Sequence, residues 1–134
     1  MVDKNILIKN IKRRSYLNEI RAIRIDKRPD ETTVDVNQKT KYIISDNSEK
    51  NIVIKVNTET FLKPEALFSI EIEHVIELMV DREITDENIH NNIKEIIAPL
   101  GAEVSYIIAS ITKEMIGSHV ILPPVLNLDI DDKL

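Results

Sequence analysis

The sequence is poor in the residues that many catalytic and cofactor sites need. It has no cysteine, no tryptophan and only two glycines among 134 residues. The absence of cysteine excludes disulfides, thiolate catalysis and cysteine-bound zinc, and it favours a reduced, cytoplasmic setting. Gly101 and Gly117 are too few and too far apart to build a phosphate-binding loop or a dinucleotide fingerprint. We therefore expect no cofactor.

Long apolar runs are also missing. No stretch approaches the roughly 20 apolar residues that a helix needs to cross a bilayer. Basic residues interrupt the N-terminus, where a signal peptide would have its apolar core: Lys4, Lys9, Lys12, Arg13 and Arg14. Hydrophobic residues make up 43% and charged residues 31% of the chain, as is typical of globular proteins. These features predict a cytoplasmic protein without membrane insertion.

The titratable residues form no recognisable catalytic or metal-binding pattern. Each histidine lacks a second histidine or a carboxylate pair at ligand spacing: His74, His90 and His119. His74 lies in an apolar strand pattern, so we expect a half-buried core or interface histidine. The alternating carboxylates of the same stretch are more typical of a solvated strand face than of acid–base chemistry. We expect no catalysis and no bound metal.

Charge is unevenly distributed along the chain. Residues 1–28 hold 9 Lys or Arg and 3 Asp or Glu, whereas the remainder holds 9 and 20. A basic arm on an acidic body could contact nucleic acid, but this arm has one aromatic, Tyr16, and no binding motif. We therefore expect its side chains to pair with acidic neighbours in the same molecule or oligomer, and no nucleic-acid partner.

Alternation of apolar and polar residues predicts strands at residues 32–44, 51–61 and 67–81. In the third, the even-numbered positions are apolar except for His74, and the odd-numbered positions are largely acidic. Residues 45–48 are expected to turn the chain, and short turns join antiparallel neighbours. Weaker alternation at residues 6–11 and 20–26 leaves two alternatives open for residues 1–26. They form a strand of the sheet, or an arm that swaps between subunits.

Residues 86–116 predict a long amphipathic helix, because apolar residues recur every three or four positions from Ile89 to Met115. Asp86 is the expected N-cap, and Gly117 suits the left-handed residue that ends a helix. Pro99 interrupts the pattern. It predicts either a kink, or a short helix followed by a restart.

Consecutive strands followed by a helix indicate the α+β class. The expected architecture is an antiparallel β-meander of about four strands, with the long C-terminal amphipathic helix packed on one face. We expect one domain over residues 1–134: a basic arm or first strand at 1–28, strands at 32–81, the helix at 86–116, and a Pro-containing apolar crossover and tail at 117–134. The apolar run at 119–128 has two interpretations. It completes the core, or it forms an apolar groove or an oligomer contact.

The C-terminal third resembles the SecB export-chaperone family. The resemblance rests on Ile97-Ala98-Pro99-Leu100 with Glu103 following, on Ile111-Thr112 before Gly117, and on the run Leu122-Pro123-Pro124-Val125-Leu126-Asn127-Leu128. In that family a hydrophobic-Pro-hydrophobic step opens the main helix, and a small-residue stop leads into a Pro-rich apolar crossover. The preceding strands match by order and length. Because the chain ends at Leu134, it resembles a shortened member without the second helix and the C-terminal tail.

The resemblance implies an ATP-independent chaperone that binds extended apolar segments of unfolded polypeptides in a groove. The client would be a preprotein or a dedicated partner such as an antitoxin. The implied client-binding residues are Val120, Ile121, Leu122, Val125, Leu126 and Leu128. The acidic strand face of Glu71, Glu73 and Glu77 resembles the surface on which family members meet the translocase motor.

Family members assemble as dimers of dimers, so the resemblance also implies a homo-oligomer, as a dimer or a dimer of dimers. This assembly suggests an alternative function. The protein could be a non-enzymatic structural or interaction subunit of the same fold, with its apolar C-terminal run buried in the oligomer.

Overall fold

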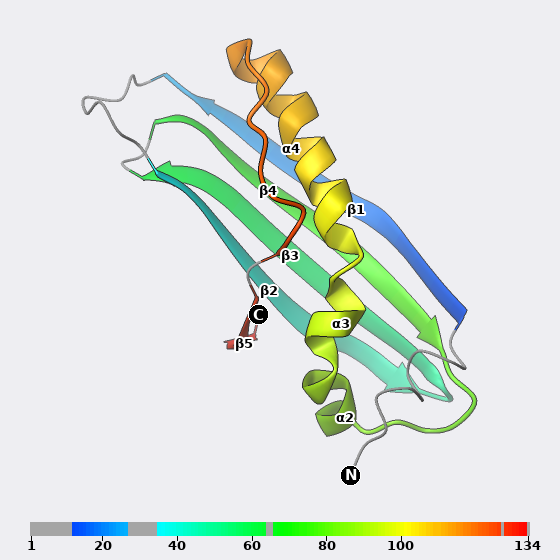
Figure 1. The fold of residues 1–134 in the computed structure, drawn as a ribbon. Coiled ribbons are helices and arrows are strands. Elements are labelled where there is room, and N and C mark those ends of the chain that lie inside the picture. The colour runs from blue at the N-terminus through cyan, green and yellow to red at the C-terminus, as the bar shows by residue number, and fades with distance from the viewer. Residues whose placement is uncertain (1–11, 27–34, 64–65, 127, 134) are drawn as a thin grey trace.

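The molecule is a mostly antiparallel sheet with helices on one face (Figure 1). The computed structural model describes residues 12–26, 35–63, 66–126 and 128–133. The strands are β1 (Lys12–Ile25), β2 (Asp35–Ser48), β3 (Asn51–Lys63), β4 (Leu67–Met79) and β5 (Leu128–Lys133), and the helices are α2 (Asp86–Asn91), α3 (Ile93–Ile97) and α4 (Leu100–Ile116). The predicted α+β class is confirmed. The weak strand predicted at residues 6–11 lies outside the described residues.

The strands of the described residues form one sheet in the order β1-β4-β3-β2-β5. β2, β3 and β4 are successive antiparallel neighbours, as the short connections predict. β1 pairs antiparallel with the far side of β4, and β5 lies parallel to β2. β1 begins at Lys12, well before the predicted residue 20, and no strand was predicted at β5.

The hairpin between β2 and β3 differs from the prediction. Residues 45–48 belong to β2, whose register shifts between Ile44 and Asp46. The chain turns instead at Glu49 and Lys50, which have positive φ angles of 51° and 65°. Two successive positive φ angles are the mark of a type I′ hairpin turn, where glycine and asparagine are usual. The turn was misplaced because Glu49 and Lys50 are atypical of this conformation.

The predicted long helix is divided into three. Pro99 precedes α4, so the structure has the restart that the sequence allowed there. A second break lies at Asn92, whose side-chain amide donates to the Asn88 carbonyl at 2.7 Å and competes with the backbone for it. The expected N-cap, Asp86, is wrong by one residue. Thr85 caps α2, because its hydroxyl accepts from the backbone N–H of Asn88 at 3.2 Å.

Helices and sheet enclose two apolar clusters that lie side by side along the sheet. In the first, α2 and α3 pack on β2, β3 and β4, with members that include Tyr42, Ile54, Ile76, Ile93 and Ile97. In the second, α4 packs on β3 and β4, with members that include Leu62, Phe68, Ile72, Val104 and Ile108. The even-numbered side chains of β4 from Phe68 to Leu78 are buried, as their alternation predicts. His74 is among them.

Candidate functional site

After α4 the chain reverses and runs back beside that helix, over the sheet (Figure 1). We refer to residues 118–126 as the crossover segment. It begins after Gly117, which ends α4 with a φ of 81°, the left-handed value predicted for it. Most of the candidate client-binding residues lie on this segment, so its attachment decides which of them are available to a partner.

Side chains of α4 hold the crossover segment by its main chain. The Ser105 hydroxyl donates to the Leu122 carbonyl at 2.6 Å, and the Val120 N–H donates to the Thr112 hydroxyl at 2.8 Å. The Nδ1–H tautomer of His119 donates to the Ala109 carbonyl at 3.0 Å. These bonds satisfy polar groups of an extended stretch that has no neighbouring strand here. They fix the segment to the helix along its length.

Gly101 allows the other end of the segment to approach the helix closely. A Cβ atom at this position would lie 2.3 Å from the Pro124 carbonyl oxygen, far inside van der Waals contact. Glycine is therefore required here for close approach of two backbones. Gly101 carries no functional group, and sequence reasoning used it only to exclude nucleotide motifs.

The structure divides the six candidate client-binding residues into two groups. Four of them pack against the core clusters and are partly buried: Val120, Leu122, Leu126 and Leu128. Ile121 and Val125 face outward, with 79% and 65% of their surface exposed. Four of the residues thus fit the interpretation that the run completes the core, and the two exposed residues remain candidates for a groove or an oligomer contact. Client contact by any of them stays a prediction.

Further apolar side chains are exposed on the helix-covered side of the molecule. Tyr106 of α4 is 74% exposed. Leu17 and Ile20 of β1 lie opposite His74 and Ile72, so they share the buried face of the sheet, yet both are exposed beyond α4. Leu17 was not predicted as an exposed strand residue, because this strand was predicted to start at residue 20. The helix periodicity identified the inward face of α4, and it did not mark Tyr106.

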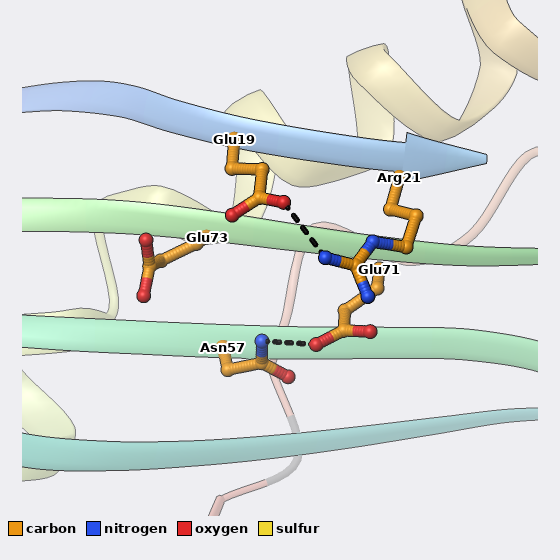
Figure 2. Close-up of a pocket in the computed structure, with 5 residues that line it drawn as sticks. All are labelled: Glu19, Arg21, Asn57, Glu71 and Glu73. Carbon is orange, nitrogen blue, oxygen red and sulfur yellow. Dashed lines mark hydrogen bonds and ion pairs between the residues drawn. The ribbon is translucent and has the colours of Figure 1, made fainter.

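The predicted acidic face lies on the opposite side of the sheet and is engaged by neighbouring side chains. Glu71 accepts from the Asn57 amide at 2.8 Å, Glu73 from the Asn18 amide at 2.6 Å, and Glu77 from the Tyr16 hydroxyl at 3.4 Å. Glu71 and Glu73 line a hollow of about 80 Å³ together with Glu19, Arg21 and Asn57. Figure 2 shows the Arg21 guanidinium between the carboxylates of Glu19 and Glu71, and it bonds Glu19 at 3.1 Å.

The basic residues of β1 take up varied partners. Arg14 lies 4.0 Å from Glu77 on β4, as expected for pairing within the molecule. Arg13 reaches the helix layer, where its Nη1 donates to the Ile96 carbonyl at 2.6 Å, at the end of α3. Burial lowers the pKa of Arg13 below its ordinary value, because desolvation disfavours the charged form.

Two buried polar contacts join the sheet to the helices. His74 is fully buried, more so than predicted, and its Nε2 lies 3.4 Å from the Glu103 carboxylate of α4. The Tyr42 hydroxyl hydrogen-bonds Nδ1 of His90 on α2 at 2.5 Å. Burial raises the pKa of Tyr42, because desolvation disfavours the phenolate.

Within the described ranges, no group of three or more His, Asp or Glu side chains is placed to hold a metal ion. No helix of the described chain is both long and apolar enough to cross a membrane.

Comparison with known proteins identifies the fold. No protein-family model matches the sequence, and no curated protein matches it. Among solved structures, the SecB-like chaperone Rv1957 of Mycobacterium tuberculosis superimposes with a TM-score of 0.74 at 9% sequence identity, over 90% of this chain and 94% of that one. The chain therefore has the SecB-like fold.

The Rv1957 structure is a complex with a ChAD peptide from the HigA1 antitoxin Rv1956. A protein of unknown function from Streptococcus agalactiae is also similar, at 16% identity over 84% of this chain and 96% of that one. Its TM-score of 0.46 is too low to support any argument.

Proposed function

We propose that this protein is an ATP-independent chaperone that holds extended apolar segments of unfolded polypeptides. The observation that carries the proposal is the crossover segment, which directs Ile121 and Val125 outward while its other apolar residues pack on the core. The fold supports the proposal, because a SecB-like chaperone that binds an antitoxin peptide shares it.

The physical basis is exposed apolar surface at a fixed place. Two aliphatic side chains four residues apart on an extended segment offer contacts to a client with little demand on its sequence. Full burial of each would contribute roughly 1.5–3 kcal/mol. In the free protein α4 holds the crossover segment in place, so the two side chains are presented to a client before it binds. Weak contacts that tolerate many sequences suit a protein that binds unfolded chains.

The proposed partner is an unfolded polypeptide, or one dedicated protein such as an antitoxin that exposes an apolar segment before it folds. Glu71, Glu73 and Glu77 would form a second partner surface on the opposite side of the sheet. Their bonds to Asn57, Asn18 and Tyr16 would have to be replaced when that partner binds. We further propose a homo-oligomer, in which exposed apolar residues such as Tyr106 become covered.

A matched pair of substitutions at adjacent positions tests the proposal. The assay is suppression of aggregation of a chemically denatured client, without nucleotide, at stoichiometric amounts of the protein. Val125→Asp should lose most of the suppression and change the free energy of unfolding by less than about 0.5 kcal/mol, because the side chain is exposed. Leu126→Asp should destabilise the fold by more than about 3 kcal/mol, because Leu126 packs against both clusters.

The control for added charge is Ile43→Asp. Ile43 is also exposed, but it precedes the shift in β2 and alternates with the buried Tyr42, so it lies on the opposite face of the sheet. Its substitution should leave the suppression unchanged. No suppression by the wild-type protein, or equal suppression by wild type and Val125→Asp, would contradict the proposal.

The alternative function is a structural or interaction subunit. It is favoured if Ile121 and Val125 are buried between copies of the chain. In that case Val125→Asp would dissociate the oligomer in light scattering, and the wild-type oligomer would not protect a denatured client.

A further inference from the structure

The buried face of the sheet contains a polar strip between the two apolar clusters. On β3, Thr58 follows Val56 of the first cluster and lies opposite Ile72 of the second. On β2, Thr40 lies opposite Thr58, and Gln38 lies opposite Thr60. We call these four residues the threonine strip. Its three threonines are at most 1% exposed.

Half of this strip has unused hydrogen-bonding capacity. Thr60 accepts from the Gln38 amide at 3.3 Å. The hydroxyls of Thr40 and Thr58 are buried and have no hydrogen-bond partner among the described residues. A buried hydroxyl without a partner lowers stability relative to an apolar group of the same shape, so it calls for an explanation. Valine is nearly isosteric with threonine and would fit the same place without that loss.

The end of the crossover segment lies at the strip. Leu126 packs against both clusters, between which the strip lies, and Leu128, two residues further on, pairs with Thr40. The segment contacts the sheet here through apolar side chains. Within the described residues, its hydrogen bonds run to Ser105, Thr112 and Ala109 of α4, and none runs to the strip.

We propose that the crossover segment is a displaceable strap: the client first contacts its outward side chains Ile121 and Val125, and an extended segment of the client then takes the strap's place on the threonine strip. This inference rests on the proposed chaperone function and specifies its site. The crossover segment itself shows that an extended apolar chain can pack against the clusters on both sides of the strip. A threonine hydroxyl both donates and accepts, so Thr40 and Thr58 can bond the N–H or C=O groups of any extended chain.

Recognition of the main chain explains how one surface accepts unrelated sequences. The apolar clusters on both sides of the strip receive aliphatic side chains of the client, and the two hydroxyls receive its backbone. The hydroxyls gain partners only when the client is bound. While the crossover segment is in place, the two unpartnered hydroxyls therefore raise the free energy of the protein. Client binding relieves this penalty and so favours displacement of the segment.

The double substitution Thr40→Val/Thr58→Val separates this inference from a purely structural role. We expect the thermal midpoint to rise by about 3 °C or more, because the unpartnered hydroxyls are removed. The dissociation constant should weaken at least about tenfold for a fluorescein-labelled, permanently unfolded carboxymethylated protein, measured by anisotropy. A side chain with only a structural role would change the midpoint and leave the affinity unchanged.

The matched control is Thr60→Val, the same change on the same strand and face. It leaves the Gln38 amide without its partner, so the thermal midpoint should fall while the affinity for the unfolded protein is retained. Hydrogen exchange provides an independent readout in the wild-type protein. The amides of residues 118–126 should exchange faster in the client complex than in the free protein.

These measurements distinguish failure of the proposed chaperone function from failure of the strap inference. A wild-type protein that does not bind the unfolded probe overturns the proposed function and this inference together. A wild-type protein that binds the probe, with the double valine variant binding equally well or residues 118–126 protected by the client, overturns the strap alone.

Discussion

At the scale of single residues, three small residues on one side of α4 decide where the crossover segment lies. Gly101 makes room for the Pro124 carbonyl, and Ser105 and Thr112 bond the segment's main chain. None of them is recognisable as functional from the sequence, because small residues in a helix usually reflect packing alone. Their role depends on a segment that returns to the helix later in the chain, 8 residues after Thr112 and 17 residues after Ser105.

Gly101→Ala should displace the crossover segment and destabilise the protein by about 1–3 kcal/mol, because the added methyl group overlaps the Pro124 carbonyl oxygen. The sign of the change in the free energy of unfolding distinguishes the steric overlap from helix propensity. Helix propensity alone predicts that alanine is more stabilising than glycine in α4, by roughly 0.5–1 kcal/mol. Urea unfolding checks the prediction, and an alanine variant more stable than wild type would contradict the close approach.

Tyr42 links stability to alkaline pH. Because its pKa is raised in the folded state, the folded protein holds this proton more tightly than the unfolded chain does. The resulting stability is fully present below the ordinary value of 10.0 and is lost as the pH rises through the higher folded value. Tyr42→Phe cannot ionise, so the stability advantage of wild type over this variant should shrink above about pH 10 in urea unfolding. An advantage that stays constant would contradict the assigned burial.

At the scale of elements, the sequence predicted the strands and helices whose apolar residues recur at regular spacing. It did not predict the features that leave no such spacing. Alternation identified β2, β3 and β4 because one side of each faces the core. It failed for the first half of β1, where nearly every residue is exposed on both faces and no burial period exists. Asn92 was missed as a break because its effect comes from a side-chain bond to Asn88 that the apolar stripe does not reveal.

The sequence predicted which segment carries the candidate site, but not which of its side chains are exposed. The apolar run after Gly117 was predicted either to complete the core or to form an apolar groove or an oligomer contact. In the structure Val120, Leu122 and Leu126 pack on the core and Ile121 and Val125 are exposed, and a groove or oligomer contact at the exposed pair stays a prediction. Composition could not predict that Val125 is exposed and Leu126 is packed on the core, because the two residues are adjacent and both aliphatic. Their separation comes from the bonds of Ser105 and Thr112, which set the orientation of the segment.

Arg13 should fasten the edge strand β1 to the helix layer. Its guanidinium donates to the Ile96 carbonyl near the break at Pro99, where a helix end leaves carbonyls to be satisfied. Arg13→Met keeps the apolar part of the side chain and should cost about 1 kcal/mol in urea unfolding, with faster amide exchange in β1.

The control is Arg14→Met on the neighbouring residue. Arg14 is largely exposed and lies 4.0 Å from Glu77, so its loss should change stability by less than about 0.5 kcal/mol. Equal effects of the two substitutions would show that the bond to Ile96 does not fasten β1.

At the scale of the whole molecule, the two sides of the sheet have different characters. One side is covered by helices and the crossover segment, and it presents Tyr106, Ile121 and Val125 to solvent. The other side presents carboxylates that are bonded to asparagine, tyrosine and arginine side chains. Because of this difference, we propose that the client binds on the helix side and that a second, polar partner binds on the other side.

Site-specific photo-crosslinking to an unfolded client tests most directly whether the client binds on the helix side of the sheet. A crosslinking amino acid is placed at residue 125 in one variant and at residue 43 in another, two exposed apolar positions on opposite sides of the sheet. We expect crosslinks to the unfolded client from residue 125, and little or no crosslinking from residue 43. Crosslinks from residue 43 without crosslinks from residue 125, or none from either, would contradict it.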